Sequence, residues 1–382
     1  MDSLPLNYSY IDTPDLRDQA IDTLSKTSVI GVDVEGDSLY SYQDKICLIQ
    51  ISGGGENFIF DPLRLDSVQP LARLFKDQAI LKIFQGSDYD LSALKRDYQF
   101  DVSPIFDTAL AARIIGLRKF SLQHLVSIYF QVDLIKAHQK SNWSERPLSE
   151  SQLDYAYKDT AYLIPLHEIL LKEIEKMGRM SQWVEECRRL EATDWRPRAP
   201  HPSDFLRIRG AAPLSVESKM ALRALVTVRD GIAKEKGRPS FKVMSNDDLI
   251  TLAHHLPRTE EDLRRVFTRD RAPVYRDPPL WLQAITDGLN ATDPLPKKEK
   301  GGFPRMTATQ ERLFIKLKEW RDKQALEENV EPTMVISTTT LKEITLKRPT
   351  TSESFAPISA LRQWQIKRYG NALLEVIHGL SP

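Results

Sequence analysis

The first 125 residues alternate between short apolar runs rich in β-branched residues and polar or glycine-rich turns. The runs lie at 28–34 (SVIGVDV), 46–52 (ICLIQIS), 57–60 (NFIF) and 80–84 (ILKIF). The first three have the length and composition of strands and predict a three-strand meander, with glycines at 53–55 in one turn. An amphipathic stretch at 71–76 and a helical period over 87–94 lie among the later runs. This order predicts an α/β domain with a mixed sheet.

A longer helical pattern begins near residue 148. Ser149 or Ser151 can cap a helix whose apolar positions continue towards residue 174. Pro165 lies inside this pattern and would cost about 3 kcal/mol in an unbroken helix. We therefore predict a helix over 149–164 and a kink or a join between two helices at Pro165.

Two proline-containing basic stretches, 195–202 (WRPRAPHP) and 292–304 (TDPLPKKEKGGFP), interrupt all periodicity and predict linkers. The segments that follow them repeat one another at an offset of 92 residues. The matching pairs are Leu225/Leu317, Arg229/Arg321, Asp230/Asp322, Ser245/Ser337, Leu249/Leu341 and Pro257/Pro349. An internal duplication of a helical unit explains the repeat. The predicted domains are an α/β domain over about 1–195 and two all-α domains over about 206–290 and 304–382.

Composition and charge add to this division. A chain of 382 residues exceeds a single core, and 41% hydrophobic with 28% charged residues is typical of a soluble globular protein. Residues 205–382 carry 30 Lys and Arg against 22 Asp and Glu, a net charge of +8, so residues 1–204 carry 23 against 31, a net charge of −8. The basic half can attract a polyanion and the acidic half suits metal cations, although ordinary solvated surface also explains such an asymmetry.

Cysteine content and hydropathy narrow the class of protein further. The sequence has only Cys47 and Cys187, which cannot form a multi-disulfide framework or a cysteine-rich zinc site. The N-terminus has no basic and apolar signal pattern, and no run of about 18 apolar residues occurs. We expect a cytoplasmic protein in a reducing compartment, with no membrane partner.

Three separate segments carry carboxylates that structure alone does not require. Asp33 and Glu35 alternate at the end of the first apolar run, so both lie on one face of a strand, where they repel each other unless a cation lies between them. Asp90 lies in the first turn of the helix after 80–84. Tyr155 and Asp159 are four residues apart and share one helix face. Four acids and a phenol converge if these elements are neighbours.

Such a cluster has a specific chemical use. Hard oxygen ligands suit Mg²⁺ or Mn²⁺, and two such ions about 3.5–4 Å apart stabilise the attacking and leaving oxygens of a phosphoryl displacement. A tyrosine one helical turn from a metal-binding aspartate can orient the attacking water. Each acid alone has an ordinary alternative, such as a solvated strand end for Asp33 and Glu35 or a first-turn acid favoured by the helix dipole for Asp90. Their joint order is what indicates a nuclease.

This order resembles the tyrosine-bearing subgroup of the DEDD superfamily of 3′→5′ exonucleases, whose three motifs match VDVEGD, FQGSDYDL and DYAYKD. The intervening segments FDT, SLQHL and KSNWSERPL are similar to ribonuclease D in particular. The resemblance covers most of residues 20–170 and implies a ribonuclease H-like fold. It implies that two divalent ions, Mg²⁺ or Mn²⁺, are bound by four acids, which are Asp33, Glu35, Asp90 and Asp159. It also implies that Tyr155 positions the attacking water.

Several neighbouring residues have more ordinary roles under this interpretation. Gln85 departs from the family pattern, where related sequences often have His. Trp143 and Arg146 could contact substrate by stacking or phosphate binding, or could anchor the loop before the last helix. We expect Asp37 and Asp88 to lie at the surface or near the site without binding metal.

The two repeats resemble the HRDC domain through LRALVTVRDGIAKEKGRPSF in the first and LKEWRDKQALEENVEP in the second. Their basic residues could bind phosphates or could be solvated helix faces; these are Lys234, Lys236, Arg238, Arg264, Arg265, Lys347, Arg348, Lys367 and Arg368. The resemblance implies a 3′→5′ exoribonuclease that releases nucleoside 5′-monophosphates and trims transfer-RNA precursors, with no obligatory protein partner. The alternatives are a DNA 3′→5′ exonuclease and a catalytically silent RNA-binding protein, and the intact acids and Tyr155 argue against the silent form.

Overall fold

The computed structural model describes residues 7–135, 137–192, 194–195, 201–267, 273–296 and 303–379. The chain divides into two compact units. The larger unit comprises Met1–Glu35, Ile46–Trp195 and Gly302–Pro382, and the smaller comprises Gly36–Lys45 and Arg196–Gly301. Among the helices of the described ranges, none has the length and apolar character needed to cross a membrane.

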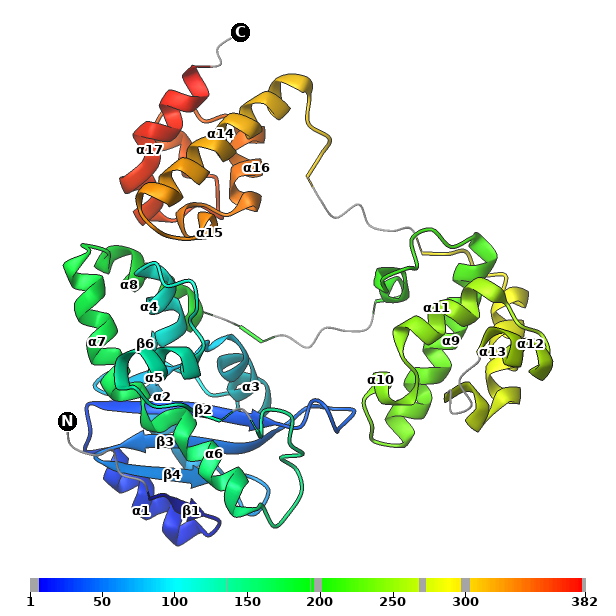
Figure 1. Ribbon diagram of the computed structural model, residues 1–382, viewed down its shortest axis with the longest axis horizontal. Helices are drawn as coiled ribbons and strands as arrows, with labels where there is room; N and C mark the ends of the chain where they lie inside the picture. Colours follow the sequence, from blue (N-terminus) through cyan, green and yellow to red (C-terminus); the bar gives the residue numbers. More distant parts are fainter. Residues whose placement is uncertain are drawn as a thin grey trace. The chain divides into compact units, whose positions relative to one another are not determined.

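A six-stranded mixed sheet is the framework of the α/β domain (Figure 1). Its strand order is β1-β4-β3-β2-β5-β6. The bounds are β1 Ser9–Ile11, β2 Val29–Gly36, β3 Ile46–Gly53, β4 Glu56–Phe60, β5 Leu81–Phe84 and β6 Ile105–Asp107. The β3–β4 pair is antiparallel, whereas β1–β4, β2–β5 and β5–β6 are parallel. Gly54 and Gly55 both have positive φ angles in the β3–β4 turn, a conformation that glycine adopts without strain.

Alternation along β2 separates its apolar and acidic side chains. Ile30, Val32 and Val34 are buried in the core beneath α1 to α3. Asp33 and Glu35 therefore point to the opposite face of the sheet, which α6 covers through its contacts with β3 and β4. The predicted placement of both acids on one face is confirmed.

Eight helices of the described residues complete the α/β domain. Their bounds are α1 Pro14–Leu24, α2 Ala72–Lys76, α3 Asp88–Tyr98, α4 Thr108–Ile114, α5 Leu122–Phe130, α6 Glu150–Ala161, α7 Leu163–Lys176 and α8 Met180–Glu191. The predicted join between two helices exists, but it falls at Tyr162 rather than at Pro165. Pro165 is tolerated because it lies in the first turn of α7, where backbone N–H groups have no partner within the helix.

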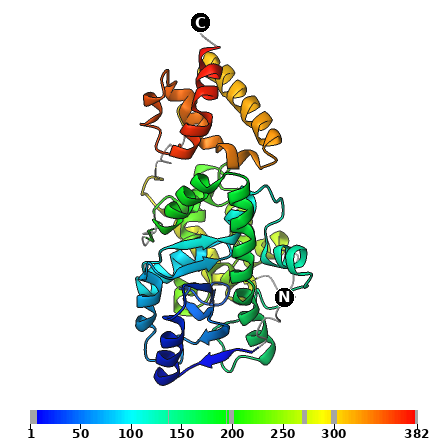
Figure 2. The same ribbon diagram turned by 90° about the vertical axis from the view of Figure 1, so that its left-hand side faces the viewer.

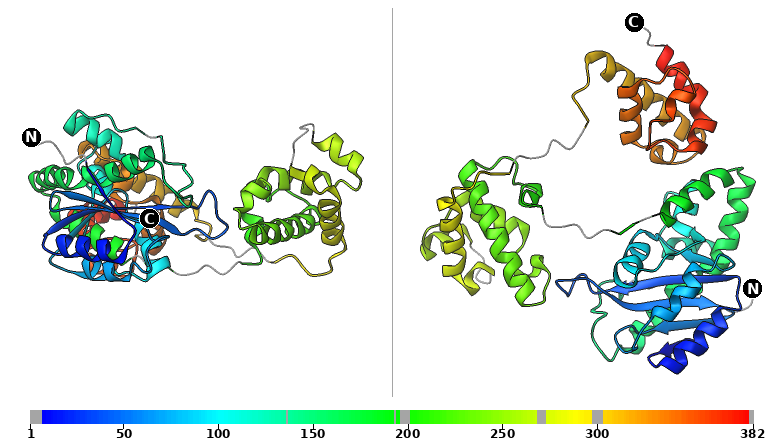
Figure 3. Two further views of the ribbon diagram at one scale, coloured as in Figure 1. Left: turned by 90° about the horizontal axis from the view of Figure 1, so that it is seen from below. Right: turned by 180° about the vertical axis from the view of Figure 1, so that it is seen from behind.

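The two C-terminal repeats are both all-helical. The first contains α9 Val216–Glu235, α10 Ser240–Val243, α11 Asn246–His255, α12 Glu260–Val266 and α13 Pro278–Asn290. The second contains α14 Ala308–Glu327, α15 Pro332–Val335, α16 Thr338–Lys347 and α17 Gln363–His378. Short 3₁₀ turns occur at Gln69–Leu71, Asp204–Arg207, Pro273–Arg276 and Glu353–Phe355. In the first repeat α9 packs against α11 and α13 (Figure 3), and in the second α14 packs against α16 and α17 (Figure 2).

The offset of 92 residues predicted from the sequence holds for the first three helices of each repeat. α9, α10 and α11 match α14, α15 and α16 end for end at that offset. Most of the two predicted linker stretches, residues 196–200 and 297–302, lies outside the described residues.

Candidate active site

Carboxylates from a strand and a helix that are far apart in the sequence meet above the sheet. One oxygen from each of Asp33 and Glu35 on β2 and Asp159 on α6 lies within 4.8 Å of the other two. Asp90, at the start of α3 and only 6% exposed, approaches from the side, and its Oδ1 accepts a hydrogen bond of 3.1 Å from the backbone N–H of Val34. The structure thus brings the four predicted acids together.

A glycine permits the close approach of the helix that carries Asp159. A Cβ at Gly31 would lie 3.0 Å from the carbonyl oxygen of Thr160 and 3.1 Å from the Cβ of Leu163. The Thr160 hydroxyl is also 2.6 Å from that of Ser52 on β3. These contacts fix the end of α6 above β2, so Asp159 is held beside Asp33.

The predicted tyrosine is attached to the acidic cluster by a hydrogen bond between its hydroxyl and Asp159. The ring of Tyr155 is flanked by Trp143, with centroids 6.1 Å apart, and by His138, at 5.9 Å. Its phenol pKa is raised by burial and by the negative charges of Asp159 and Glu35. A phenol held in this way remains protonated and can donate a hydrogen bond.

Burial and mutual repulsion raise the pKa of all four carboxyl groups. Burial is the first cause in every case, with further repulsion among Asp33, Glu35, Asp90 and Asp159. The pKa of Asp159 rises to about 7. Across the described ranges, no Lys or Arg forms an ion pair with any of the four. This set of hard oxygen donors without a counter-charge fits divalent cations such as Mg²⁺ or Mn²⁺.

These pKa shifts predict how the stability of the metal-free protein depends on pH. A carboxyl group with a raised pKa binds more protons in the folded than in the unfolded state between about pH 4 and pH 7, so stability falls as pH rises through that interval. We expect urea denaturation in EDTA to give a lower free energy of unfolding at pH 7.5 than at pH 5.5. The decrease should be smaller in Asp33→Asn and should be reversed by Mg²⁺. An equal pH slope in wild type and variant would contradict this electrostatic description.

A residue without a predicted role, Asp107, organises the turn that presents Asp90. Asp107 ends β6 and is 3% exposed. Its carboxylate accepts hydrogen bonds from the N–H groups of Gly86 (3.1 Å) and Ser87 (2.7 Å) and from the Ser87 hydroxyl (2.8 Å). It also caps α4 through the N–H of Leu110. The sequence signals were the FDT segment shared with ribonuclease D and an aspartate before a helix, which is also the signal of an ordinary cap.

Gln85 has a similar positioning role. Its amide nitrogen donates to the carbonyl oxygen of Phe120 at 2.7 Å, and its amide oxygen accepts from the Thr108 hydroxyl at 2.6 Å. Gln85, which differs from the histidine often found in related sequences, thus links the end of β5 to the segment before α5.

Removal of the Asp107 side chain should weaken Mg²⁺ binding and slow hydrolysis, although Asp107 is not one of the predicted metal ligands. We expect Asp107→Ala to lower kcat by about 10–100-fold and to raise the Mg²⁺ concentration needed for half-maximal rate, as losses of supporting partners do at other metal sites. Ser121→Ala serves as a control for the loss of a helix cap, because the Ser121 hydroxyl accepts from the N–H of His124 within α5. A Mg²⁺ requirement unchanged from wild type would show that Asp107 has only a folding role.

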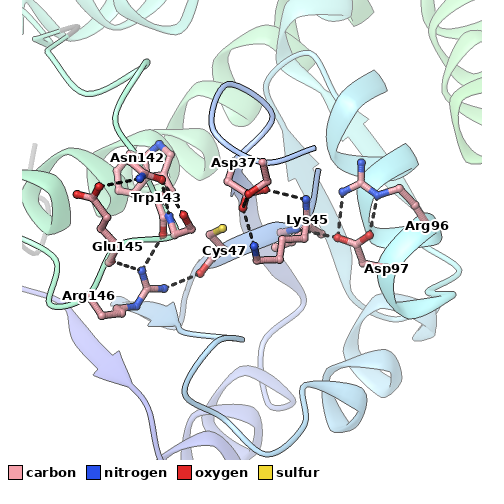
Figure 4. A network of polar contacts seen from close by, with 12 residues as sticks. Asp37, Lys45, Cys47, Arg96, Asp97, Asn142, Trp143, Glu145 and Arg146 are labelled. Atoms are coloured by element: carbon pink, nitrogen blue, oxygen red, sulfur yellow. Dashed lines mark hydrogen bonds and ion pairs between the residues drawn. The ribbon is translucent and has the colours of Figure 1, made fainter. Parts of the chain in front are cut away.

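Arg146 and Trp143 both belong to the loop before α6. The Arg146 guanidinium forms an ion pair with buried Asp61 at 2.6 Å. It also donates to the carbonyl oxygens of Trp143 and Cys47 (Figure 4). Trp143 is 1% exposed. These contacts support the alternative that both residues anchor the loop, and their contact with substrate stays a prediction.

The two acids not expected to bind metal differ in environment. Asp88 is exposed at the start of α3. Asp37 is fully buried rather than at the surface, and it accepts hydrogen bonds from the backbone N–H and the ammonium of Lys45 (Figure 4). Asp37 therefore organises its own loop.

A cavity of about 240 Å³ lies beside the tyrosine of the acidic cluster. Its apolar lining comes from Val132, Leu134, Ile135 and Tyr162, and its polar lining includes Tyr155 and Asp159. An apolar cavity bordered by two residues of the cluster can accept a planar base next to reacting phosphate oxygens.

Comparisons with known proteins agree with this geometry. Residues 8–175 match the family described as 3'-5' exonuclease, and residues 218–285 and 310–377 each match the HRDC domain. The fold and the acidic cluster therefore define a DEDD 3′→5′ exonuclease domain followed by two HRDC domains. Ribonuclease D of Zymomonas mobilis is 32% identical over 64% of this chain and 63% of its own length. The chain is thus similar to the ribonuclease D and RRP6 proteins, and it spans less than two thirds of the length of these relatives.

Other relatives share part of their length with the chain. The exosome complex component 10 homolog of Caenorhabditis elegans is 32% identical over 65% of this chain, which spans 29% of that protein. Among solved structures, Escherichia coli RNase D has a TM-score of 0.68 at 20% identity, covering 98% of this chain and 99% of its own. A protein from Bifidobacterium adolescentis has a TM-score of 0.77 at 21% identity, covering 99% and 98%. At these identities the two structures show the shared fold.

Proposed function

We propose that the chain hydrolyses the 3′-terminal phosphodiester of RNA and releases nucleoside 5′-monophosphates one at a time. The observation that supports this most is the convergence of Asp33, Glu35, Asp90 and Asp159 without a counter-charge, beside an apolar cavity. The cavity of about 240 Å³ next to the cluster suits one terminal nucleotide. This arrangement favours cleavage at a chain end over cleavage within a chain.

The residues of the site would divide the work of hydrolysis among them. The four carboxylates would hold two divalent ions, which when bound supply charge stabilisation to the attacking and leaving oxygens of the phosphate. Tyr155 orients the attacking water. Its hydroxyl is hydrogen-bonded to Asp159, and its ring lies against those of Trp143 and His138. Asp159 and its neighbours are ionised once cations replace their protons. The apolar wall at Leu134 and Ile135 receives the terminal base.

The substrate class rests on the relatives and on charge. The relatives include proteins named ribonuclease D and exosome complex components. Residues 205–382 have a net charge of +8, which suits a polyanion larger than the terminal nucleotide. We infer that the substrates are structured RNAs with single-stranded 3′ tails, transfer-RNA precursors among them.

The test compares three 5′-labelled polymers with the full chain and Mg²⁺ or Mn²⁺. They are a transfer RNA with a 3′ extension, a single-stranded RNA and a single-stranded DNA of the same sequence. We expect stepwise shortening of both RNAs from the 3′ end, faster than that of DNA, and slowed about a hundredfold by Tyr155→Phe. Shortening of DNA alone would favour the DNA exonuclease alternative. No shortening of any polymer would favour the silent RNA-binding alternative.

A further inference from the structure

The two HRDC repeats present the same structural turn with different chemistry. Because α9, α10 and α11 match α14, α15 and α16 at an offset of 92, each residue of the turn between the first two helices has a counterpart. The backbone conforms to this match, since Gly237 and its counterpart Asn329 have φ angles of 59° and 51°. The side chains of the two turns can therefore be compared position by position.

In the first repeat this turn is basic and exposed. Its four cations, here called the basic turn, are Lys234, Lys236, Arg238 and Lys242. Within the part of the chain that the structure describes, no carboxylate forms an ion pair with the first three. Two acids, Glu235 and Asp230, lie in the same stretch, and Asp230 accepts a hydrogen bond from the Ser240 hydroxyl. The cations outnumber the acids, so the turn attracts anions.

Aromatic rings accompany the basic turn. Phe241 is 53% exposed and lies next to Lys242 in the chain. The Lys242 ammonium lies 3.9 Å from the ring centroid of Tyr40, and the N–H of Tyr42 donates to the carbonyl oxygen of Gly237 at 3.1 Å. Tyr40 and Tyr42 belong to Gly36–Lys45, the segment of the smaller unit that directly follows Glu35 in the chain. Cations beside rings are the surface chemistry that binds single-stranded nucleic acid.

In the second repeat the counterparts of the four cations are Leu326, Glu328, Val330 and Met334. Glu328 accepts from Arg179, the residue before α8 of the exonuclease domain, at 3.3 Å, and Arg179 is only 7% exposed. The carbonyl oxygen of Asn329 would lie 2.2 Å from a Cβ at Gly116, so the two backbones are in close contact. Glu328 is held by contacts within the larger unit, Val330 and Met334 are buried, and Leu326 is 77% exposed but carries no charge.

We propose that the two repeats have divided their roles: the basic turn of the first repeat binds the phosphates of single-stranded RNA, and the matching turn of the second repeat anchors that repeat to the exonuclease domain without binding RNA. The proposal deepens the proposed function, on which its choice of RNA rests. Lysine and arginine neutralise phosphates, and the rings of Phe241 and Tyr40 provide surfaces on which bases stack.

The experiment measures binding separately from hydrolysis. The full chain is titrated into a fluorescein-labelled single-stranded RNA in EDTA at several KCl concentrations, and fluorescence anisotropy gives Kd. The RNA has about 20 nucleotides, so that it can reach beyond the site of the terminal nucleotide. The test variant carries Lys234→Glu, Lys236→Glu and Arg238→Glu. The matched control carries Arg312→Glu, Lys316→Glu and Lys318→Glu, three exposed residues on α14 of the second repeat with the same change in charge. Circular dichroism verifies that both variants keep their helices.

We expect the test variant to bind RNA at least about tenfold more weakly than wild type. The slope of log Kd against log [KCl] should fall by about two, because each of the three lost phosphate contacts accounts for about 0.7 of that slope on a single strand. The control should stay within about twofold of wild type. Unchanged binding by the test variant, or an equal loss in the control, would overturn the division of roles.

A dinucleotide substrate separates this proposal from the proposed function. Hydrolysis of a two-nucleotide RNA with Mg²⁺ should be the same in both variants and wild type, because such a substrate needs no second contact. If wild type hydrolyses no RNA, the exonuclease function fails, while the anisotropy result still decides whether the basic turn binds RNA.

Discussion

Asp33→Asn should abolish hydrolysis while making the metal-free protein more stable. Asp33 shares its site with Glu35 and Asp159, and partial burial together with repulsion among these carboxylates raises their pKa. An amide of the same shape removes one negative charge and one ligand. Since a bound cation contributes several kcal/mol to the transition state, we expect the rate to fall by about a thousandfold or more. Relief of repulsion should raise the free energy of unfolding in EDTA by about 1 kcal/mol.

The control for this prediction is Asp88→Asn. Asp88 lies two residues before Asp90, but it is exposed at the surface of α3. The same chemical change there should leave both the rate and the stability near those of wild type. The measurements are mononucleotide release with Mg²⁺ and urea denaturation in EDTA. A fall in stability for Asp33→Asn would mean that the carboxylate is held by attractive contacts, contrary to the electrostatics of the site.

Arg179→Ala should release the second HRDC repeat from the exonuclease domain. The Arg179 guanidinium donates to the carbonyl oxygens of Ile114 and Glu328 and forms an ion pair with the Glu328 carboxylate, which also accepts from Tyr369 at 2.8 Å. Glu328 keeps an ion pair with Arg368 at 3.0 Å, so the main loss is that of the hydrogen bonds to the two carbonyl oxygens, which costs about 1–3 kcal/mol. We expect a lower urea midpoint and a separate early transition for the second repeat. Hydrolysis of a dinucleotide should persist.

Two further variants separate undocking from general destabilisation. Arg188→Ala removes an exposed arginine from α8, the helix that Arg179 precedes, and should leave the urea midpoint unchanged. Glu328→Gln alters only the side of the second repeat and should produce the same early transition with a smaller shift. A single cooperative transition in both Arg179→Ala and Glu328→Gln would contradict the anchoring role.

The sequence was informative where local rules decide the structure. Alternation on β2 placed Asp33 and Glu35 on one face, and the four-residue spacing of Tyr155 and Asp159 placed them on one helix face, as observed. The offset of 92 residues matched the first three helices of the two repeats one to one. Each of these depends on the fixed period of a strand or a helix.

Features that depend on tertiary contacts were not predictable in this way. β1 and β6 have three residues each, too few for a pattern, and they exist because β4 and β5 offer them a free edge. Asp107 acts on Gly86 and Ser87 across two strands, which no local pattern encodes. The pairing of Arg179 with Glu328 joins residues 149 positions apart.

The most direct test of the active site uses a single-stranded RNA labelled only in its 3′-terminal nucleotide. With the full chain and Mg²⁺, the first labelled product should be a nucleoside 5′-monophosphate, absent in EDTA and absent with Asp33→Asn. Release of the label in a longer oligonucleotide, as a nucleoside 3′-monophosphate, or at an unchanged rate in EDTA would contradict metal-dependent hydrolysis of the terminal phosphodiester by the four-carboxylate site.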